Sequence, residues 1–72
     1  MNRLDLKKLG TACKRYRKRK GILQLQVALE TGYNTKTISM FECGNTNNAK
    51  ILAWYINHGM PIEYVRGCYN GR

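Results

Sequence analysis

The chain contains little negative charge, one proline, one histidine and no long hydrophobic run. Only four of its 72 residues are acidic, against 13 lysines and arginines, which gives a formal net charge of +9. The hydrophobic core of so short a chain supplies only a few kcal/mol of stability, which is little support for a buried, preorganised catalytic site. Paired carboxylates and a Ser/His/Asp set are also absent from the sequence, so we do not expect an enzyme. The short apolar runs exclude a signal peptide and a membrane-spanning helix. We therefore expect a cytoplasmic protein that needs no cofactor and does not enter a membrane.

The three cysteines, Cys13, Cys43 and Cys68, form no recognisable motif. Their odd number, wide spacing and lack of a CxxC pair argue against a disulfide framework and favour a reducing compartment. Together with His58 they have the composition of a Cys3His zinc site, but zinc ligands usually come in closely spaced pairs. We expect buried or half-buried thiols that behave as small hydrophobic side chains, and no metal.

The positive charge indicates a polyanionic partner, either nucleic acid or an anionic membrane surface. A hydrophobic content of 43% with seven aromatic residues is too high for a basic disordered tail. The length allows one domain, which we expect over residues 1–67, followed by a short C-terminal tail over residues 68–72. The sequence thus predicts a small, folded, basic module.

The apolar residues recur with helical spacing, and no segment alternates with a period of two over the length of a strand. Asn34 and Asn48 are expected N-caps, and Pro61 is expected at the first position of the last helix. The fold class is therefore all-α, with five helices expected over residues 5–20, 22–31, 35–43, 48–58 and 62–66.

The segment from Gln24 to Glu42 carries most information. Two short helices joined across Gly32 by a tight turn are the helix-turn-helix arrangement. Ala28 is small enough for the helices to cross closely, and Gly32 allows the left-handed backbone that the turn requires. Val27 and Ile38, together with Phe41, are the expected apolar contacts at the crossing.

Four motifs stand in one gap-free register: GILQLQVA from Gly21, GY from Gly32, TIS from Thr37 and FECG from Phe41. Together they resemble the Cro/repressor-type (XRE-like) helix-turn-helix family of phage and bacterial transcriptional regulators. The similarity runs from about residue 9 to residue 67. It implies a compact five-helix lambda-repressor-like domain that binds a double-stranded DNA operator and regulates transcription as a repressor.

The resemblance also implies which residues contact DNA. Base contacts fall on the third helix, at Thr35, Lys36, Ser39 and Met40. Lys36 is the best candidate to read a guanine through O6 and N7, while Thr35 or Met40 offers apolar contact to a thymine methyl group. The implied phosphate contacts are Gln24, Thr37, Asn45, Thr46 and Asn47.

Arg17 and Glu42 match a structural ion pair of the family, although Arg17 binding a phosphate is the alternative. The basic run from Lys14 to Lys20 lies on the first helix, behind the expected recognition helix. It is either a solvated face that attracts nucleic acid, a phosphate contact through Arg19 or Lys20, or a surface for a second acidic partner.

A dimer is expected because one small module covers little DNA. Trp54 falls at the edge of the apolar stripe of the fourth helix, where it is expected to be half-exposed. With Met60, Ile62 and Tyr64 it forms a candidate homodimer interface, which would place half-sites about 34 Å apart.

Two other functions fit the sequence. Leu23 stands where the family usually has a capping Ser or Thr, and with Leu25 it places two apolar side chains near the expected DNA-facing edge. These residues favour a small phage-type inhibitor that binds a host nucleic-acid enzyme through this surface or through the basic first helix. The third function is RNA or non-specific nucleic-acid binding by the first helix.

Overall fold

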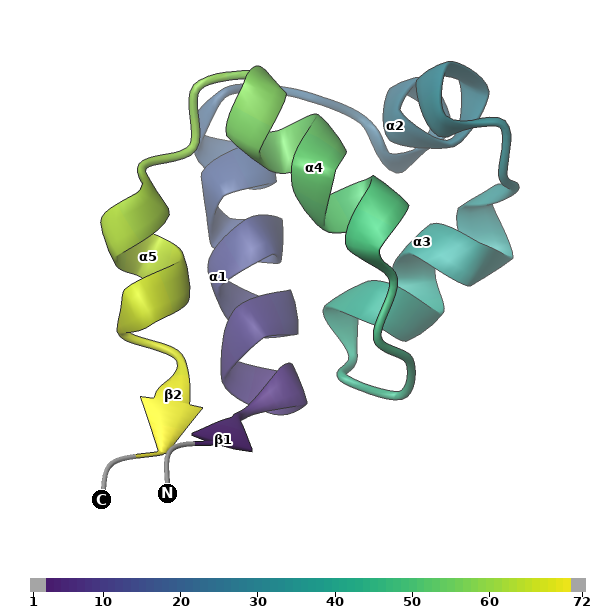
Figure 1. Ribbon diagram of the computed structural model, residues 1–72. Coiled ribbons are helices and arrows are strands. Elements are labelled where there is room, and N and C mark those ends of the chain that lie inside the picture. The colour runs from purple at the N-terminus through teal and green to yellow at the C-terminus, as the bar shows by residue number, and fades with distance from the viewer. Residues whose placement is uncertain (1–2, 71–72) are drawn as a thin grey trace.

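The computed structural model describes residues 3–70, and its longest element is helix α1 (Leu6–Arg19). The Asp5 side chain caps its N-terminus by accepting hydrogen bonds from the amides of Lys7 and Lys8. α1 lies between α5 (Ile62–Arg66) on one side and α3 (Thr35–Glu42) on the other (Figure 1). Its apolar face is thereby buried from both sides.

Helices α2 (Gln24–Thr31) and α3 (Thr35–Glu42) are joined by a three-residue turn that begins at Gly32. Gly32 has φ 82°, a left-handed conformation that glycine adopts without steric cost. The second helix begins at Gln24, two residues later than the sequence predicts. The reason is that Arg17 exchanges hydrogen bonds with the backbone of Ile22, which keeps the linker extended up to Leu23.

Helices α4 (Ala49–Asn57) and α5 (Ile62–Arg66) complete the fold. Asn34 and Asn48 cap α3 and α4 through their side-chain oxygens, which confirms both predicted N-caps. Pro61 has an extended ψ of 138° and is the N-cap residue of α5, not its first helical residue. The predicted all-α class with five helices is confirmed, with the boundaries corrected by one or two residues.

Two short strands, which the sequence pattern does not predict, join the ends of the described chain. β1 (Arg3–Leu4) pairs antiparallel with β2 (Tyr69–Asn70). The amide of Asp5 also donates to the carbonyl of Cys68, whose side chain is buried. Residues 68–70 therefore belong to the domain and are not a separate tail, while residues 71–72 lie outside the described residues.

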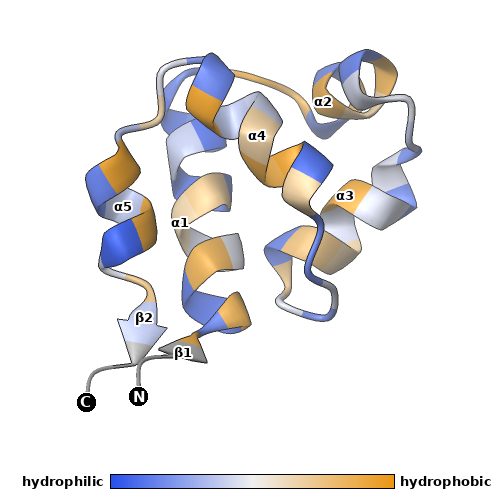
Figure 2. Ribbon diagram, in the orientation of Figure 1, coloured by the Kyte–Doolittle hydropathy of each residue, from blue (hydrophilic) through white to orange (hydrophobic). Residues whose placement is uncertain are grey.

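All five helices contribute buried residues to one core, and each helix is striped with hydrophobic and hydrophilic residues (Figure 2). Leu6, Leu52 and Ile56 are half-buried. Thr31, a polar residue at a buried position, donates its hydroxyl to the carbonyl of Val27 at 2.7 Å and so leaves no unsatisfied group. The buried hydrophobic residues are Leu9, Cys13, Tyr16, Val27, Ala28, Ile38, Phe41, Ile51, Trp54, Tyr55, Met60, Val65 and Cys68.

α1 and the end of α3 approach each other closely at Gly10. A Cβ atom at Gly10 would lie 2.5 Å from the carbonyl oxygens of both Phe41 and Glu42. Only a glycine allows this contact, because the neighbouring atoms belong to the backbone and cannot rotate away. Gly10 thus fixes the distance between α1 and the helix expected to read DNA.

Candidate nucleic-acid interface

The four residues expected to contact bases lie together on the outer face of α3. Thr35 and Lys36 are exposed, Met40 is 37% exposed, and Ser39 is half-buried. Their spacing places them on one side of the helix, while Ile38 and Phe41 are buried on the other. An α-helix with its side chains is about 10–12 Å across, and a major groove about 12 Å wide admits such a helix.

The first turn of α3 is held by Asn34. Its Oδ1 atom accepts a hydrogen bond from the amide of Thr37 at 2.9 Å and another from the Thr37 hydroxyl at 3.0 Å. The single hydroxyl hydrogen of Thr37 is therefore engaged inside the protein. A hydrogen bond from this hydroxyl to a phosphate would have to replace the bond to Asn34, so Thr37 contributes to positioning α3.

Arg17 and Glu42 form a buried ion pair that joins α1 to the end of α3. Arg17 Nε donates to Glu42 Oε2 at 2.7 Å, and Nη2 donates to Oε1 at 3.1 Å. The remaining Nη1 atom donates to the carbonyl of Ile22. Since every guanidinium nitrogen is bound and the side chain is 8% exposed, the structure favours the ion pair over the alternative role of Arg17 as a phosphate ligand.

Glu42 also accepts hydrogen bonds from two further helices. The Tyr55 hydroxyl donates to Oε2 at 2.8 Å, and Gln24 Nε2 donates to Oε1 at 3.1 Å. Gln24, expected at a phosphate, is half-buried at the start of α2 and has one amide hydrogen left. The same carboxylate thus positions the beginning of α2 relative to α3.

The hydrogen bonds determine the charge state of Glu42. Burial acts to raise the pKa of this carboxyl, but the bonds from Arg17, Gln24 and Tyr55 outweigh burial and hold the pKa below its ordinary value of 4.5. A carboxylate with a lowered pKa stabilises the folded state at a pH above the unfolded value. This stabilisation is lost as the pH falls below 4.5 and through the lower pKa of the folded state.

We expect Tyr55→Phe to reduce the loss of stability in acid. The change removes one hydrogen bond to the Glu42 carboxylate, which moves its pKa closer to the unfolded value. It should cost about 1–3 kcal/mol at neutral pH, but the further fall in unfolding free energy between about pH 6 and pH 3 should be smaller. Urea unfolding at each pH measures both quantities.

Tyr16→Phe is the matched control for this prediction. The Tyr16 hydroxyl also makes one hydrogen bond, but to the neutral carbonyl of His58 at 2.8 Å. We expect the control to lower stability by a similar amount at both pH values. An identical acid loss in Tyr55→Phe and in the unchanged protein would contradict the assigned role of Glu42.

The loop between α3 and α4 presents two of the three expected phosphate ligands. Asn45 and Asn47 are exposed. Thr46 is half-buried, and its Oγ1 atom is buried with no hydrogen-bond partner among the described residues. The expected phosphate contact by the Thr46 hydroxyl is therefore not available in this conformation, because the oxygen faces the protein.

Arg19 and Lys20 are directed toward other parts of the protein. Arg19 Nη1 donates to the Tyr64 hydroxyl of α5 at 3.0 Å. The Nζ atom of Lys20 lies 5.8 Å from the centre of the Tyr16 ring. Both residues are at the end of α1 that is close to α4 and α5 (Figure 1), so they are not grouped with the exposed face of α3.

Lys50 is a basic residue near the turn between α2 and α3, and the sequence pattern did not single it out. It is exposed in the first turn of α4, and its Nζ atom lies 5.5 Å from the centre of the Tyr33 ring. Tyr33 belongs to the turn between α2 and α3. The available signal was its position two residues after the N-cap Asn48, beside the end of the polar loop.

Trp54 and Met60 are not on the surface, which corrects half of the expected dimer interface. They are 6% and 2% exposed within one chain. Trp54 packs edge-on against Tyr55, and its indole N–H donates to Glu30 Oε1 at 2.8 Å, a bond that lowers the pKa of Glu30. Of the four residues, only Ile62 is exposed, at 47%, and Tyr64 is half-buried.

The cysteines are dispersed. Cys13 is fully buried, which raises its pKa to about 12, and Cys68 is buried with its thiol donating to the carbonyl of Tyr64. Cys43 is exposed. Within residues 3–70, no group of three or more His, Cys, Asp or Glu side chains is arranged to hold a metal ion.

No family model, curated protein or solved structure matches this chain. In the part of the chain that the structure describes, none of the helices combines the length and apolar character of a membrane span. Function is therefore inferred from the geometry of the exposed α3 face and its surroundings.

Proposed function

We propose that this protein is a sequence-specific double-stranded DNA-binding regulator of transcription in which α2 and α3 form a helix-turn-helix of the lambda-repressor type. The observation that carries this proposal is the exposed face of α3, which presents polar and apolar side chains. The opposite face of the same helix is fully buried. The tight turn at Gly32 and the buried Glu42 network support it, because they hold α3 rigidly on the body of the domain.

In this proposal α3 enters the major groove and reads a small number of bases. Lys36 donates to O6 and N7 of a guanine, and the methyl group of Thr35 or the side chain of Met40 contacts a thymine methyl group. The Ser39 hydroxyl can donate to or accept from a base edge one turn later. Regulation follows from occupancy of the operator and involves no catalysis.

Phosphate contacts fix the position of α3 and do not carry sequence information. Gln24 offers its second amide hydrogen, Asn45 and Asn47 offer exposed amides, and Lys50 adds a charge beside the turn. The basic residues of α1 add long-range attraction. A two-fold dimer is part of the proposal, with Ile62 as the remaining exposed candidate for its interface.

Selection of bound sequences from a random pool of duplex DNA tests this function. We expect one enriched motif with two-fold symmetry. Lys36→Ala should cost about 1–3 kcal/mol at one base pair and relax the preference there, and Thr35→Ala should relax it at a neighbouring position. Lys14→Ala and Lys18→Ala are the controls, because they should keep the motif and reduce the dependence of affinity on salt.

Two results would contradict the proposal in different ways. A pool that shows no enriched motif would remove sequence-specific binding. A monomeric mass in sedimentation experiments at binding concentrations, both with and without DNA, would remove the dimer but leave the reading role of α3 intact.

A second function is favoured by the exposed leucines of α2 and of its N-cap. Leu23, Leu25 and Leu29 are 68%, 56% and 73% exposed. Apolar side chains exposed together on a small basic protein are typical of a protein-interaction surface. An inhibitor of a host nucleic-acid enzyme would use this surface, and it would be favoured over the regulator if random DNA yields no motif.

A further inference from the structure

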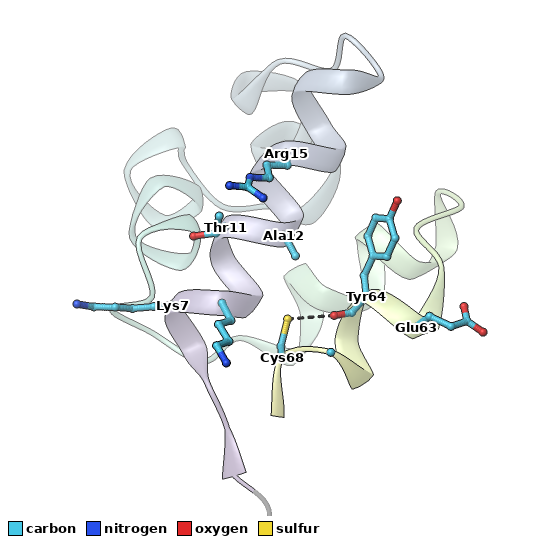
Figure 3. A pocket seen from close by; sticks show the side chains of 9 residues that line it. Lys7, Thr11, Ala12, Arg15, Glu63, Tyr64 and Cys68 are labelled. Atoms are coloured by element: carbon cyan, nitrogen blue, oxygen red, sulfur yellow. Dashed lines mark hydrogen bonds between the residues drawn. The ribbon is translucent and has the colours of Figure 1, made fainter. Parts of the chain in front are cut away.

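A groove lies between α1 and α5, whereas α3 packs against α1 on its other side (Figure 1). This α1–α5 groove has a volume of about 460 Å³, within the range of about 300–1,000 Å³ that is typical of ligand pockets. Figure 3 shows Ala12 directed toward α5, with Tyr64 opposite and Cys68 between the two helices. The central part of the groove is therefore apolar.

Basic residues of α1 lie beside this apolar centre. Lys7, Lys8 and Arg15 of α1 line the groove, and Glu63 is the one acidic residue that does. Figure 3 shows Lys7 and Glu63 extending in opposite directions. Within residues 4–69 no carboxylate lies within ion-pair distance of these three cations. Their charges are thus available to a ligand.

Tyr64 fixes one end of the groove. Its ring packs edge-on against Tyr16, with 6.4 Å between the ring centres, and its hydroxyl oxygen accepts a hydrogen bond from Arg19. The guanidinium of Arg19 is therefore held beside the groove as a fourth positive group. The hydroxyl hydrogen of Tyr64 has no acceptor among the described residues, so it can donate to an incoming carboxylate.

We propose that the α1–α5 groove binds an acidic peptide segment of a partner protein, with one apolar side chain in the centre and Asp or Glu on both sides. Lys8 pairs with a carboxylate at one end, and Arg15 and Arg19 pair with those at the other. This surface is separate from α3, so the proposal goes beyond DNA binding and does not depend on it.

The charges and the shape of the groove favour a peptide over other occupants. A second copy would bring a net charge of +9 toward the same cations, and its Glu30 and Glu42 are already engaged by Trp54 and Arg17. A nucleic acid would place phosphates on the rim and leave the apolar centre without a partner. An apolar side chain flanked by carboxylates satisfies both parts of the groove.

Fluorescence anisotropy with a designed probe tests this proposal. The probe is a labelled nine-residue peptide of aspartate and glutamate with a central leucine. We expect Arg15→Glu to weaken peptide binding by about tenfold or more. The ion pair between Arg15 and a peptide carboxylate is lost, and the new glutamate repels that carboxylate. Lys14→Glu, an exposed neighbour outside the groove with the same change in charge, should weaken binding by only about twofold.

Four further measurements complete the test: an alanine variant of the peptide, NMR shifts, oligonucleotide binding and a protein concentration series. The same peptide with a central alanine should bind more weakly, and amide shifts in two-dimensional NMR should be confined to α1 and α5. Equal weakening by Arg15→Glu and Lys14→Glu, or equal binding of the alanine peptide, would overturn the proposal. So would tighter binding of a single-stranded oligonucleotide at the same amides, or shifts of the groove-lining amides of α1 that appear on raising the protein concentration without a peptide.

Discussion

Glu42→Ala should remove most or all of the stability of the folded state. The substitution leaves the Arg17 guanidinium buried without its carboxylate and removes the acceptor for Tyr55 and Gln24. Breaking a buried ion pair by removing one partner costs about 3–5 kcal/mol. A chain of 72 residues has a total stability of only about 4–11 kcal/mol at 0.05–0.15 kcal/mol per residue. Far-ultraviolet circular dichroism during heating measures the loss.

Glu63→Ala is the matched control for this substitution, because it removes the same charge from an exposed position on α5. We expect its unfolding free energy to stay within about 0.5 kcal/mol of the original protein. An unchanged melting temperature in Glu42→Ala would show that the carboxylate does not hold α1, α2 and α4 against α3.

Gly10→Ala should have the second-largest effect. Its Cβ atom would meet the carbonyl oxygens of Phe41 and Glu42 at 2.5 Å, so α1 and α3 would have to move apart. Overpacking of this kind costs about 1–3 kcal/mol and sometimes more. We expect the upper end of that range, since the obstructing atoms belong to the backbone, despite a gain of about 0.8–1.0 kcal/mol in helix propensity. Urea unfolding measures the net change.

Gly67→Ala provides the comparison for this second prediction. Gly67 has a helical φ of −69°, and the nearest atoms to an added Cβ are at 3.6 and 3.7 Å, an ordinary contact distance. We expect a neutral effect or a gain of up to about 1 kcal/mol. If Gly10→Ala behaved like Gly67→Ala, the close approach of α1 to α3 would not limit stability.

The helix ends could be predicted from the sequence because their causes are local. Asn34 and Asn48 cap α3 and α4 by bonds to amides two or three residues further on, so the sequence spacing alone contains the contact. The start of α2 was predicted two residues too early, because the linker is held extended by Arg17, which lies on another helix. Such a bond leaves no mark in the local pattern.

The burial of single residues was harder to predict. The helical stripe places Trp54 at an edge, but in the fold Trp54 is buried and its indole N–H is bonded to Glu30, a residue 24 positions away. Gly10 gives no local indication of which backbone crosses it. The ion pair of Arg17 and Glu42 was predicted from the family resemblance. The hydrogen bonds that Tyr55 and Gln24 donate to the Glu42 carboxylate could not be predicted, because they depend on how α2 and α4 are placed.

The pairing of β1 with β2 has a consequence for how this domain connects to other chains. Leu4 stands opposite Tyr69, so the two ends of the described segment leave the domain side by side, below α1 and α5 (Figure 1). Domains with adjacent ends tolerate insertion and circular permutation well. Two copies can accordingly be joined head to tail by a flexible linker, and each unit can keep both terminal strands paired.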